Sequence, residues 1–248
     1  MGELAHRVVG QAEPLPARRP GNIGTSSRTE FPDLLGDLVR RGQLSYTRTS
    51  FAEGSTVYRG QHPDESIYLV LTGRVKTIVH SRSGKMCLLR IYGAGEVVGE
   101  LALLDGARTE PAVAMDPVDM LRFSDEALFR ALDGRVLHRH LIQHLAGRLA
   151  EQQTSISHLV TDDSEHRLGV TLLDLAHRLG RAGPTGVTIH DRITQEELAH
   201  IVGTTRSRVG YFLRRFEEAG AVEFRTGRVL RVRPAALRFY LDARADAG

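Results

Sequence analysis

The most informative segment of the sequence is ITQEELAHIVGTTRSRVGYFLRRFEEA, residues 193–219. Its apolar residues recur at helical spacing, which predicts two short amphipathic helices joined by a tight turn at Gly203. Thr194 is placed to cap the first helix, and Glu197, three residues later, is placed to return the hydrogen bond. The apolar positions are Leu198, Ile201 and Val202 in the first helix and Val209, Phe212, Leu213 and Phe216 in the second.

The second of these helices keeps a polar face near its N-terminal end. Two helices with this turn form a helix-turn-helix, whose second helix enters the major groove of DNA with its first residues at the base edges. Arg206 is best placed for a bidentate contact with guanine, and Arg208 for a base or phosphate contact. Tyr211 either stacks, lies against a thymine methyl group or is half-buried. The residues predicted to contact DNA are Thr194, Gln195, Thr204, Thr205, Arg206, Ser207, Arg208 and Tyr211.

The composition is that of an ordinary globular protein and excludes several other classes. With 248 residues, 41% of them apolar, the chain can hold two modest domains. No apolar run reaches the roughly 18 residues of a transmembrane helix and no signal peptide is visible, so no membrane partner is expected. The single cysteine, Cys87, excludes a disulfide within one chain and fits a cytoplasmic location. The net charge of +3 excludes a polycationic binder but not a DNA-binding protein with a local basic face.

Residues 51–123 contain short apolar segments separated by turns that contain glycine. Segments of this length and spacing predict the strands of an antiparallel sandwich or barrel. The residues before them, 1–30, are rich in Gly, Pro, Arg and Ser and lack sustained periodicity, which predicts a mostly disordered extension. The predicted strand segments are SIYLVLTG (66–73), RVKTIVH (74–80), MCLLRIYG (86–93) and AVAMDPVDMLRF (112–123).

From Ser124 the pattern becomes helical. Ser124 is placed to cap a short helix through Leu132, and a long helix is predicted from Arg135 to Val160. One face of the long helix repeats at heptad spacing, which is typical of a helix that pairs with its twin. The alternative is that a wider stripe, including Leu137 and Leu141, packs the helix on its own domain. The predicted dimer interface consists of Ile142, Leu145, Leu149, Gln152, Ile156 and Leu159.

The C-terminal third is predicted to continue with further helices and a hairpin. Asp162 and Asp163 are expected to end the long helix, to cap the next helix (166–179) and to act as a hinge. The segment GRAGPTG (180–186) is predicted to be a loop. After the helix-turn-helix, VEFRTGRVLRV (222–232) predicts two strands joined by a Thr-Gly turn. Such a hairpin forms a wing, on which Arg225, Arg228 and Arg231 are candidates for phosphate contacts.

This order of elements resembles the cAMP receptor protein/fumarate–nitrate regulator (Crp/Fnr) family of bacterial transcription factors, over about residues 40–235. The segments that carry the resemblance are EGSTVYRGQHPDESIYLVLTGRVK (53–76), GAGEVVGELALLDGARTEPAVAM (93–115) and ITQEELAHIVGTTRSRVG (193–210). The resemblance implies an α+β fold. It would comprise the disordered extension at 1–30, an antiparallel β-roll of the cyclic-nucleotide-binding, jelly-roll type at 31–133, a dimerisation helix at 134–162 and a winged helix-turn-helix at 163–248.

In the members of this family that bind cyclic nucleotides, the GELAL segment and a following Arg-Ser/Thr pair form a phosphate cassette. By that resemblance Glu100 would accept a hydrogen bond from the ribose and Arg108 would pair with the phosphate. The sequence departs from the family at Glu110, a carboxylate that repels a phosphate unless it turns outward. Arg108 could alternatively be an ordinary surface arginine, so cAMP or another cyclic nucleotide remains an open candidate. The other predicted ligand-binding residues are Gly99, Leu101, Thr109, Gln152 and Gln153, the glutamines standing where the cAMP receptor has small hydroxyl side chains.

Other cofactors and catalysis are not expected. The iron–sulfur branch of the family needs several cysteines, and this chain has one. The haem branch uses an axial histidine, and His140 and His144 have the i,i+4 spacing of a metal pair. Since no third ligand motif accompanies them, they are interpreted as solvated helix histidines, and neither a metal nor haem is predicted. The chain contains no nucleophile elbow, metal triad or Walker loop, which argues against an enzyme.

Two hypotheses follow from these patterns. In the first, the protein is a cytoplasmic homodimer that regulates transcription by binding a palindromic operator in double-stranded DNA, with RNA polymerase as a further candidate partner. A small molecule in the roll would then bias the tilt of the long helices. In the second, the dimer binds DNA without a ligand, and the roll is a scaffold or a protein-interaction domain. The polar Gln152 inside the apolar seam either fixes the helix register or faces the ligand.

Overall fold

The structure is a computed structural model that describes residues 30–60, 66–80, 86–103, 108, 110–131, 134–189, 193–225 and 229–245. The predicted extension, except for Glu30, lies outside these ranges. The described residues form two compact units. The first contains residues 30–80 and 89–150, and the second contains residues 151–245 together with the short piece 86–88. The domain boundaries expected from the sequence remain predictions.

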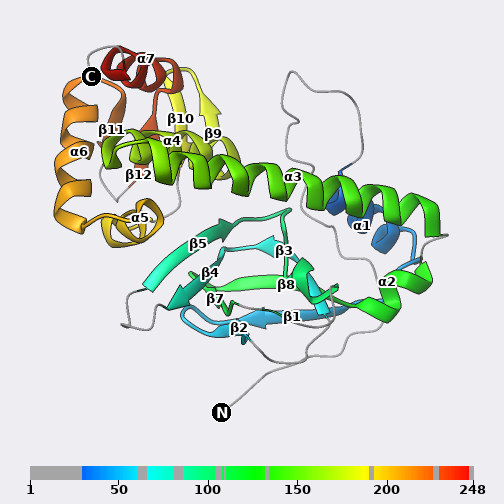
Figure 1. Ribbon diagram of the computed structural model, residues 1–248. Coiled ribbons are helices and arrows are strands. Elements are labelled where there is room, and N and C mark those ends of the chain that lie inside the picture. Colours follow the sequence, from blue (N-terminus) through cyan, green and yellow to red (C-terminus); the bar gives the residue numbers. More distant parts are fainter. Residues whose placement is uncertain are drawn as a thin grey trace. The chain divides into compact units, whose positions relative to one another are not determined.

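Two four-stranded antiparallel sheets form the roll, which lies in the first unit apart from the first three residues of β5 (Figure 1). One sheet has the order β1-β8-β3-β6 and the other β2-β7-β4-β5. All four predicted strand segments form strands, which confirms the antiparallel roll. The strands are β1 (Thr47–Phe51), β2 (Thr56–Tyr58), β3 (Ser66–Thr72), β4 (Val75–His80), β5 (Met86–Tyr92), β6 (Val97–Val98), β7 (Ala112–Ala114) and β8 (Val118–Ser124).

Strand β3 is buried on both faces, and this explains its uninterrupted apolar sequence. Side chains alternate between the two faces of a strand. Tyr68 and Val70 therefore point between the two sheets, while Ile67 and Leu69 face the opposite side of their own sheet. That second side is covered by helix α1 (Phe31–Arg40) and helix α2 (Asp125–Ala131). A one-turn 3₁₀ helix, η1 (Glu100–Leu103), follows β6.

Helix α1 was not predicted from the sequence, although its signal is present. Phe31, Leu35 and Leu38 recur at helical spacing and are buried against the roll. Helix α2 was predicted, and the expected cap is present, because the hydroxyl of Ser124 accepts a hydrogen bond from the backbone N–H of Ala127 at 3.1 Å. The two helices close the face of the roll that would otherwise leave Ile67 and its neighbours in water.

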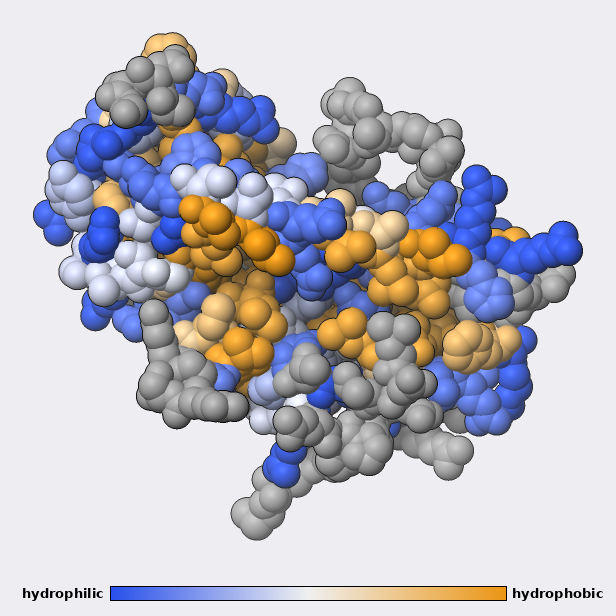
Figure 2. Space-filling model, viewed as in Figure 1, coloured by the Kyte–Doolittle hydropathy of each residue, from blue (hydrophilic) through white to orange (hydrophobic). Residues whose placement is uncertain are grey.

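Helix α3 (Gly134–Thr161) contains 28 residues and is about 42 Å long at 1.5 Å per residue. Within the first unit, Leu141 packs against the core of the roll, and the His144 ring lies 5.3 Å from the ring of Phe31. Other apolar side chains of α3 lie in solvent, and apolar surface gathers over this helix in Figure 2. Despite its length, neither α3 nor any other helix in the described ranges is apolar enough to cross a membrane.

The second unit consists of helices around a small four-stranded sheet of order β11-β12-β10-β9. Its core contains Leu168, Leu172, Phe216 and Leu237. The predicted hairpin is present as β11 (Val222–Arg225) and β12 (Val229–Val232). The other elements are α4 (Ser164–Leu179), β9 (Arg181–Gly183), β10 (Gly186–Ile189), α5 (Gln195–Val202), α6 (Arg206–Glu218) and α7 (Pro234–Ala245).

The prediction of a loop over residues 180–186 was wrong. Residues 181–183 form β9 and pair with Gly186–Thr188, so that Pro184 and Thr185 make a tight hairpin turn. The segment is rich in glycine and proline, and a three-residue strand carries no alternation that could oppose that signal. The strand is formed because β10 offers its backbone groups for pairing. Helix α7 was also not predicted, and it packs on α4 at Gly169, where an added Cβ would lie 2.7 Å from Leu241.

Helices α4, α6 and α7 are tied together by one buried carboxylate. Glu165 is 4% exposed and accepts hydrogen bonds from the Arg215 guanidinium at 3.1 Å and from the Tyr240 hydroxyl at 2.7 Å. Arg244 forms an ion pair with the same carboxylate at 2.9 Å. Burial raises the pKa of Tyr240, and its hydrogen bond to Glu165 raises that pKa further. A charged network at this place fixes how α6 is held against the rest of the unit.

Replacing Glu165 with glutamine is expected to lower the free energy of unfolding by roughly 1–2 kcal/mol. The substitution keeps the shape but removes the charge that two arginines share. Arg215 and Arg244 are 33% and 43% exposed, so water compensates part of the loss. Urea denaturation measures the change, with Glu218→Gln, an exposed position of α6, as the control. Equal midpoints for Glu165→Gln and the control would show that the network contributes nothing to stability.

Candidate functional site

The helix-turn-helix is built by the local signals that the sequence contains. At the start of α5, Thr194 and Glu197 form a complete capping box. Helix α5 ends at Gly203, whose φ of 71° lies in the left-handed region that favours glycine. Thr205 then caps α6 by accepting a hydrogen bond from the N–H of Arg208. These three features define the ends of α5 and α6 and the turn between them, and α4 packs against both helices.

The residues predicted to contact DNA lie together at the N-terminal end of α6 and the start of α5. Arg206, Ser207 and Arg208 are exposed, whereas Thr204 is half-buried. Tyr211 is 57% exposed, so the alternative that it is half-buried was wrong. Gln195 approaches α6 closely, since a Cβ on Gly210 would lie 3.1 Å from its side-chain oxygen. The positive end of the helix dipole at Arg206 adds to the attraction for phosphate.

Arg214 extends the same surface and was missed in the sequence analysis. It is exposed and stands seven residues after Ser207 and three after Tyr211, so all three share one side of α6. Helical spacing alone could have identified it. On the wing, Arg231 forms a 3.2 Å ion pair with Glu223, and its contact with phosphate remains a prediction. The side chain of Arg225 and the whole of Arg228 fall outside the described part of the wing.

In the roll, Arg108 is held inside the protein. It is 1% exposed, its guanidinium donates to the backbone oxygen of Ser66, and its central carbon lies 4.0 Å from the centre of the Tyr58 ring. The interpretation of Arg108 as a surface arginine was therefore wrong. Gly99 has a φ of 89°, and a Cβ there would lie 3.3 Å from the Arg108 guanidinium. The glycine thus permits the backbone after β6 to approach this arginine.

Glu100 is buried beside Arg108 but is already engaged by an arginine of α3. The Arg148 Nε donates to its carboxylate at 2.9 Å, and the Arg148 Nη2 donates to the Tyr92 hydroxyl at 2.6 Å. His144 lies 4.0 Å from the same carboxylate. Neither Arg148 nor Tyr92 was predicted, because they meet Glu100 only in the fold. A ribose that used Glu100 would have to share it with Arg148 or displace that side chain.

Glu110 is also buried, so it does not turn outward as a phosphate pocket would require. Its charge is felt by Tyr58, whose pKa is raised well above its ordinary value, foremost by burial and then by Tyr92 and Glu110. Burial raises the pKa of Tyr92 to about 12, and the charge of Glu100 acts in the same direction. Both phenols therefore stay protonated at neutral pH, and the Tyr92 hydroxyl accepts its hydrogen bond from Arg148 in that form. The site balances two arginines, Arg108 and Arg148, with two carboxylates.

The positions of the remaining predicted ligand-binding residues do not test their contact with a ligand. Leu101 is 36% exposed in η1. Thr109 lies outside the described residues. Gln152 and Gln153 are exposed on the part of α3 that belongs to the second unit. Their contact with a ligand, and the place of Gln152 in a dimer seam, remain predictions.

The predicted dimer surface is exposed along α3. Ile142, Leu149 and Ile156 are 65%, 56% and 60% exposed, and Leu159 is 52% exposed. Leu145 is half-buried, and Leu141 is the off-seam residue that packs on the roll. The helix thus has two apolar faces, one covered by its own unit and one in water. Large apolar side chains in a row on a surface are typical of a face that contacts another molecule, and the dimer interface remains a prediction.

The His140–His144 pair is not brought together as metal ligands, because His144 packs on Phe31 beside Glu100. Within the described ranges, one group of three potential metal ligands is present, and it lies elsewhere. It consists of His158, Asp162 and His166, at the junction of α3 and α4. The sequence analysis did not single out this group.

Comparison with known proteins matches both units. The model of the cyclic nucleotide-binding domain matches residues 48–135, and that of the Crp-like helix-turn-helix domain matches residues 166–240. A CRP-like cAMP-activated global transcriptional regulator of Mycobacterium tuberculosis is 30% identical over 182 residues, covering 73% of this chain and 81% of its own length. The cyclic AMP receptor protein of Thermus thermophilus is 31% identical over 211 residues, covering 84% and 93%. The solved structure of the c-di-GMP responsive global regulator of Xanthomonas campestris has the same fold, with a TM-score of 0.63 and 24% identity over 80% of this chain and 99% of its own.

Proposed function

The chain belongs to the cAMP receptor protein/fumarate–nitrate regulator family of transcription regulators, and from this we propose that it acts as a cytoplasmic homodimer on a palindromic operator. It is a transcription regulator with a DNA-binding helix-turn-helix and a cyclic nucleotide-binding domain, and not an enzyme. Membership of the family does not decide the oligomeric state, the identity of the effector or the way in which the effector controls DNA binding.

The exposed seam of α3 is the observation that supports the proposal of a dimer. Ile142, Leu149 and Ile156 repeat at seven-residue intervals, and all three are more than half exposed. A seven-residue apolar repeat on one face of a helix is buried when two copies of the helix pair in parallel. Pairing around a two-fold axis then relates two copies of α6, each carrying Arg206 at its exposed end.

A symmetric pair of α6 helices selects DNA with matching symmetry. Two recognition helices dock in successive major grooves when they are about one helical turn, 34 Å, apart. Selection of bound sequences from random duplexes tests this proposal. It should return an inverted repeat with half-site centres about 10 base pairs apart. Recovery of single, unrepeated sites would contradict the dimeric docking.

The roll is the proposed sensor, and a cyclic nucleotide is the candidate effector. The fold of the roll and the buried Arg108 support this proposal. An arginine that lies close to the backbone of a glycine, here Gly99, is suited to binding a phosphate. Binding would shift an equilibrium between two spacings of the recognition helices, with the Asp162–Asp163 junction as the hinge. RNA polymerase remains a candidate partner of the bound dimer.

A second candidate function has a specific observation in its favour. Glu100 is engaged by Arg148, and the buried Glu110 supplies a second negative charge near Arg108. A site that neutralises its own charges does not need a ligand to be stable. In this case the dimer binds DNA constitutively, and the roll serves as a scaffold or as a contact for another protein.

Replacing Glu110 with glutamine distinguishes the two candidates. If a cyclic nucleotide binds, removing the nearby carboxylate should strengthen its binding about tenfold, because it removes a like charge from a poorly solvated site. Calorimetry with cAMP and with cGMP measures the affinity, and Glu126→Gln in α2, where the side chain is 70% exposed, is the matched control. Absence of binding heat in all three proteins, with operator affinity unchanged by either nucleotide, would contradict the sensor and favour the scaffold.

A further inference from the structure

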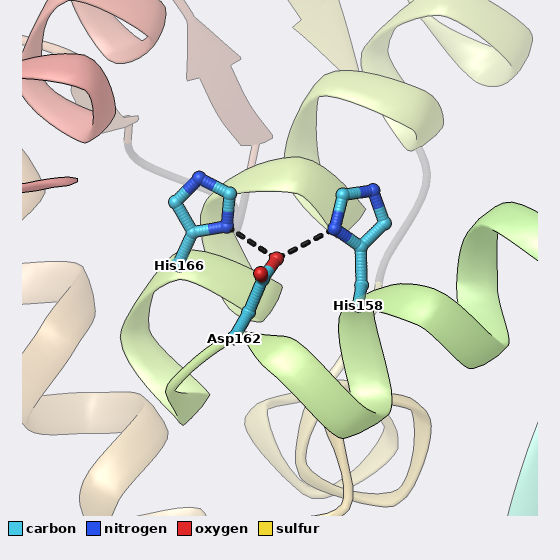
Figure 3. Close-up of side chains that lie close together, drawn as sticks. All are labelled: His158, Asp162 and His166. Carbon is cyan, nitrogen blue, oxygen red and sulfur yellow. Dashed lines mark hydrogen bonds and ion pairs between the residues drawn. The ribbon is translucent and has the colours of Figure 1, made fainter.

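Three side chains that bind metal ions converge where α3 meets α4 (Figure 3). His158 comes from the last turn of α3, Asp162 lies between the helices, and His166 comes from the first turn of α4. The Nδ1 atoms of the two histidines lie 2.5 Å and 2.6 Å from the same Asp162 oxygen, Oδ2. One potential ligand atom from each residue lies within 4.8 Å of the others.

The backbone at the junction produces this convergence. The α3 helix ends at Thr161, and Asp163 begins α4 by accepting hydrogen bonds from the N–H groups of Glu165 and His166. The chain therefore turns between the two histidines while keeping them four residues on either side of Asp162. The imidazole rings end 6.0 Å apart at an angle of 42°, directed at one carboxylate.

The described groups around the three side chains do not come between the two Nδ1 atoms and the Asp162 Oδ2 that they face. The Thr161 hydroxyl donates to the other oxygen of Asp162, Oδ1, at 2.9 Å. Arg167 touches the junction through its backbone, because its guanidinium donates to the backbone oxygens of Asp162 and Val202. Burial alone would raise the pKa of Asp162, but hydrogen bonds from His158, Thr161 and His166 outweigh it and leave that pKa below its ordinary value.

We propose that His158, Asp162 and His166 bind a divalent first-row transition ion, of which Zn²⁺ is the representative. Two imidazole nitrogens and one carboxylate oxygen are a donor set that suits zinc, with ligand distances of about 2.0–2.2 Å. Each histidine would bind through Nδ1, with its proton on Nε2. Small rotations of the three side chains would open the present hydrogen bonds and admit the ion. Three protein ligands leave a fourth position for water.

Such an ion would restrain the junction between α3 and α4. It would link the last turn of α3 to the first turn of α4 through bonds stronger than the hydrogen bonds present. The side chains of His158, Asp162 and His166 are 30%, 17% and 32% exposed, so an ion can reach them from solvent. Binding of the ion itself does not depend on the proposed function, whereas an effect of the ion on operator affinity does.

Calorimetric titration of the untagged, chelator-treated full chain with ZnCl₂ tests the site. One ion should bind per chain, and the double variant His158→Ala/His166→Ala should bind it more than about 100-fold more weakly, since even outer partners of metal ligands are worth 10- to 100-fold. The chain has 11 histidines, so His177→Ala, an exposed histidine of α4, serves as the control and should bind like the unmodified protein. Co²⁺ in place of Zn²⁺ should give a visible absorption band that the double variant lacks.

Thermal unfolding separates loss of the site from loss of the fold. Without metal, the double variant should unfold cooperatively, and Zn²⁺ should raise the Tm of the unmodified protein and of His177→Ala but not of the double variant. Absence of binding to the unmodified chain, or equal binding by the double variant, would overturn the proposal. Operator affinity is measured separately with and without Zn²⁺, so a failure of DNA binding leaves the metal result standing.

Discussion

Replacing Leu149 and Ile156 together with glutamate should convert the protein into a monomer whose operator affinity is lower by at least about 100-fold. Both side chains stand on the exposed seam of α3, one heptad apart. In a parallel helix pair each seam residue lies against its own copy, so the variant would place two pairs of like charges in a poorly solvated contact. A single helix-turn-helix would then bind one half-site without the second.

Sedimentation velocity and gel shift measure the two effects of this double substitution. The matched control is Gln143→Glu/Ser157→Glu, which adds the same charge at exposed positions of α3 outside the seam. The control should stay dimeric and keep its operator affinity. If the Leu149→Glu/Ile156→Glu protein sedimented as a dimer and bound the operator normally, the seam would not be the interface.

Replacing Arg206 with alanine should reduce discrimination between the operator and altered sites by about 1–3 kcal/mol. Arg206 is the first residue of α6 and is exposed at the end of the helix that enters the groove. A guanidinium at this position can donate two hydrogen bonds to guanine, and no other base offers the same pair of acceptors. The cap of α6 is formed by Thr205, so the helix itself should persist.

Competition gel shifts with the operator and with single-base variants measure this discrimination. Arg238→Ala removes the same charge from an exposed position of α7 and is the control for the general loss of positive charge. The Arg206 variant should lose selectivity at one base pair in each half-site, while the control should retain it. Unchanged selectivity in the Arg206 variant would remove this residue from the base-reading set.

The sequence predicted those parts of the fold that depend on neighbouring residues. Caps at Ser124, Asp163 and Thr194, and the left-handed turn at Gly203, are set within a few residues, and all of them are present. The β-roll was predictable because its strands are separated by regular turns. Helix α1 has an equally clear apolar pattern, but it is short and follows a segment without periodicity, so it was not recognised.

The buried ion pairs inside the two units could not be predicted from local patterns. Arg148 and Glu100 are 48 residues apart, and Arg215 and Glu165 are 50 residues apart. Each pair forms because the fold brings two elements together, and the spacing of the residues in the sequence does not predict such a pair. The family motif singled out Arg108, which is buried, but it did not show that Arg148 already holds Glu100 or that Glu110 is buried.

The group at the α3–α4 junction was within reach of the sequence. His158, Asp162 and His166 are spaced by four residues, as on one side of a helix, yet the break at Asp162–Asp163 argued against a continuous helical face. The structure shows that the break preserves the convergence, because α4 starts immediately after it. Histidines on either side of a predicted helix junction therefore merit attention in other sequences.

The claim on which the rest depends is that two copies of the chain pair along α3. Multi-angle light scattering of the unmodified protein, alone at micromolar concentration and with its operator duplex, tests it most directly. Pairing along α3 predicts a protein mass of twice 27.4 kDa in both samples, with two chains on each duplex. A mass of 27.4 kDa in both, with one chain on each duplex, would contradict it.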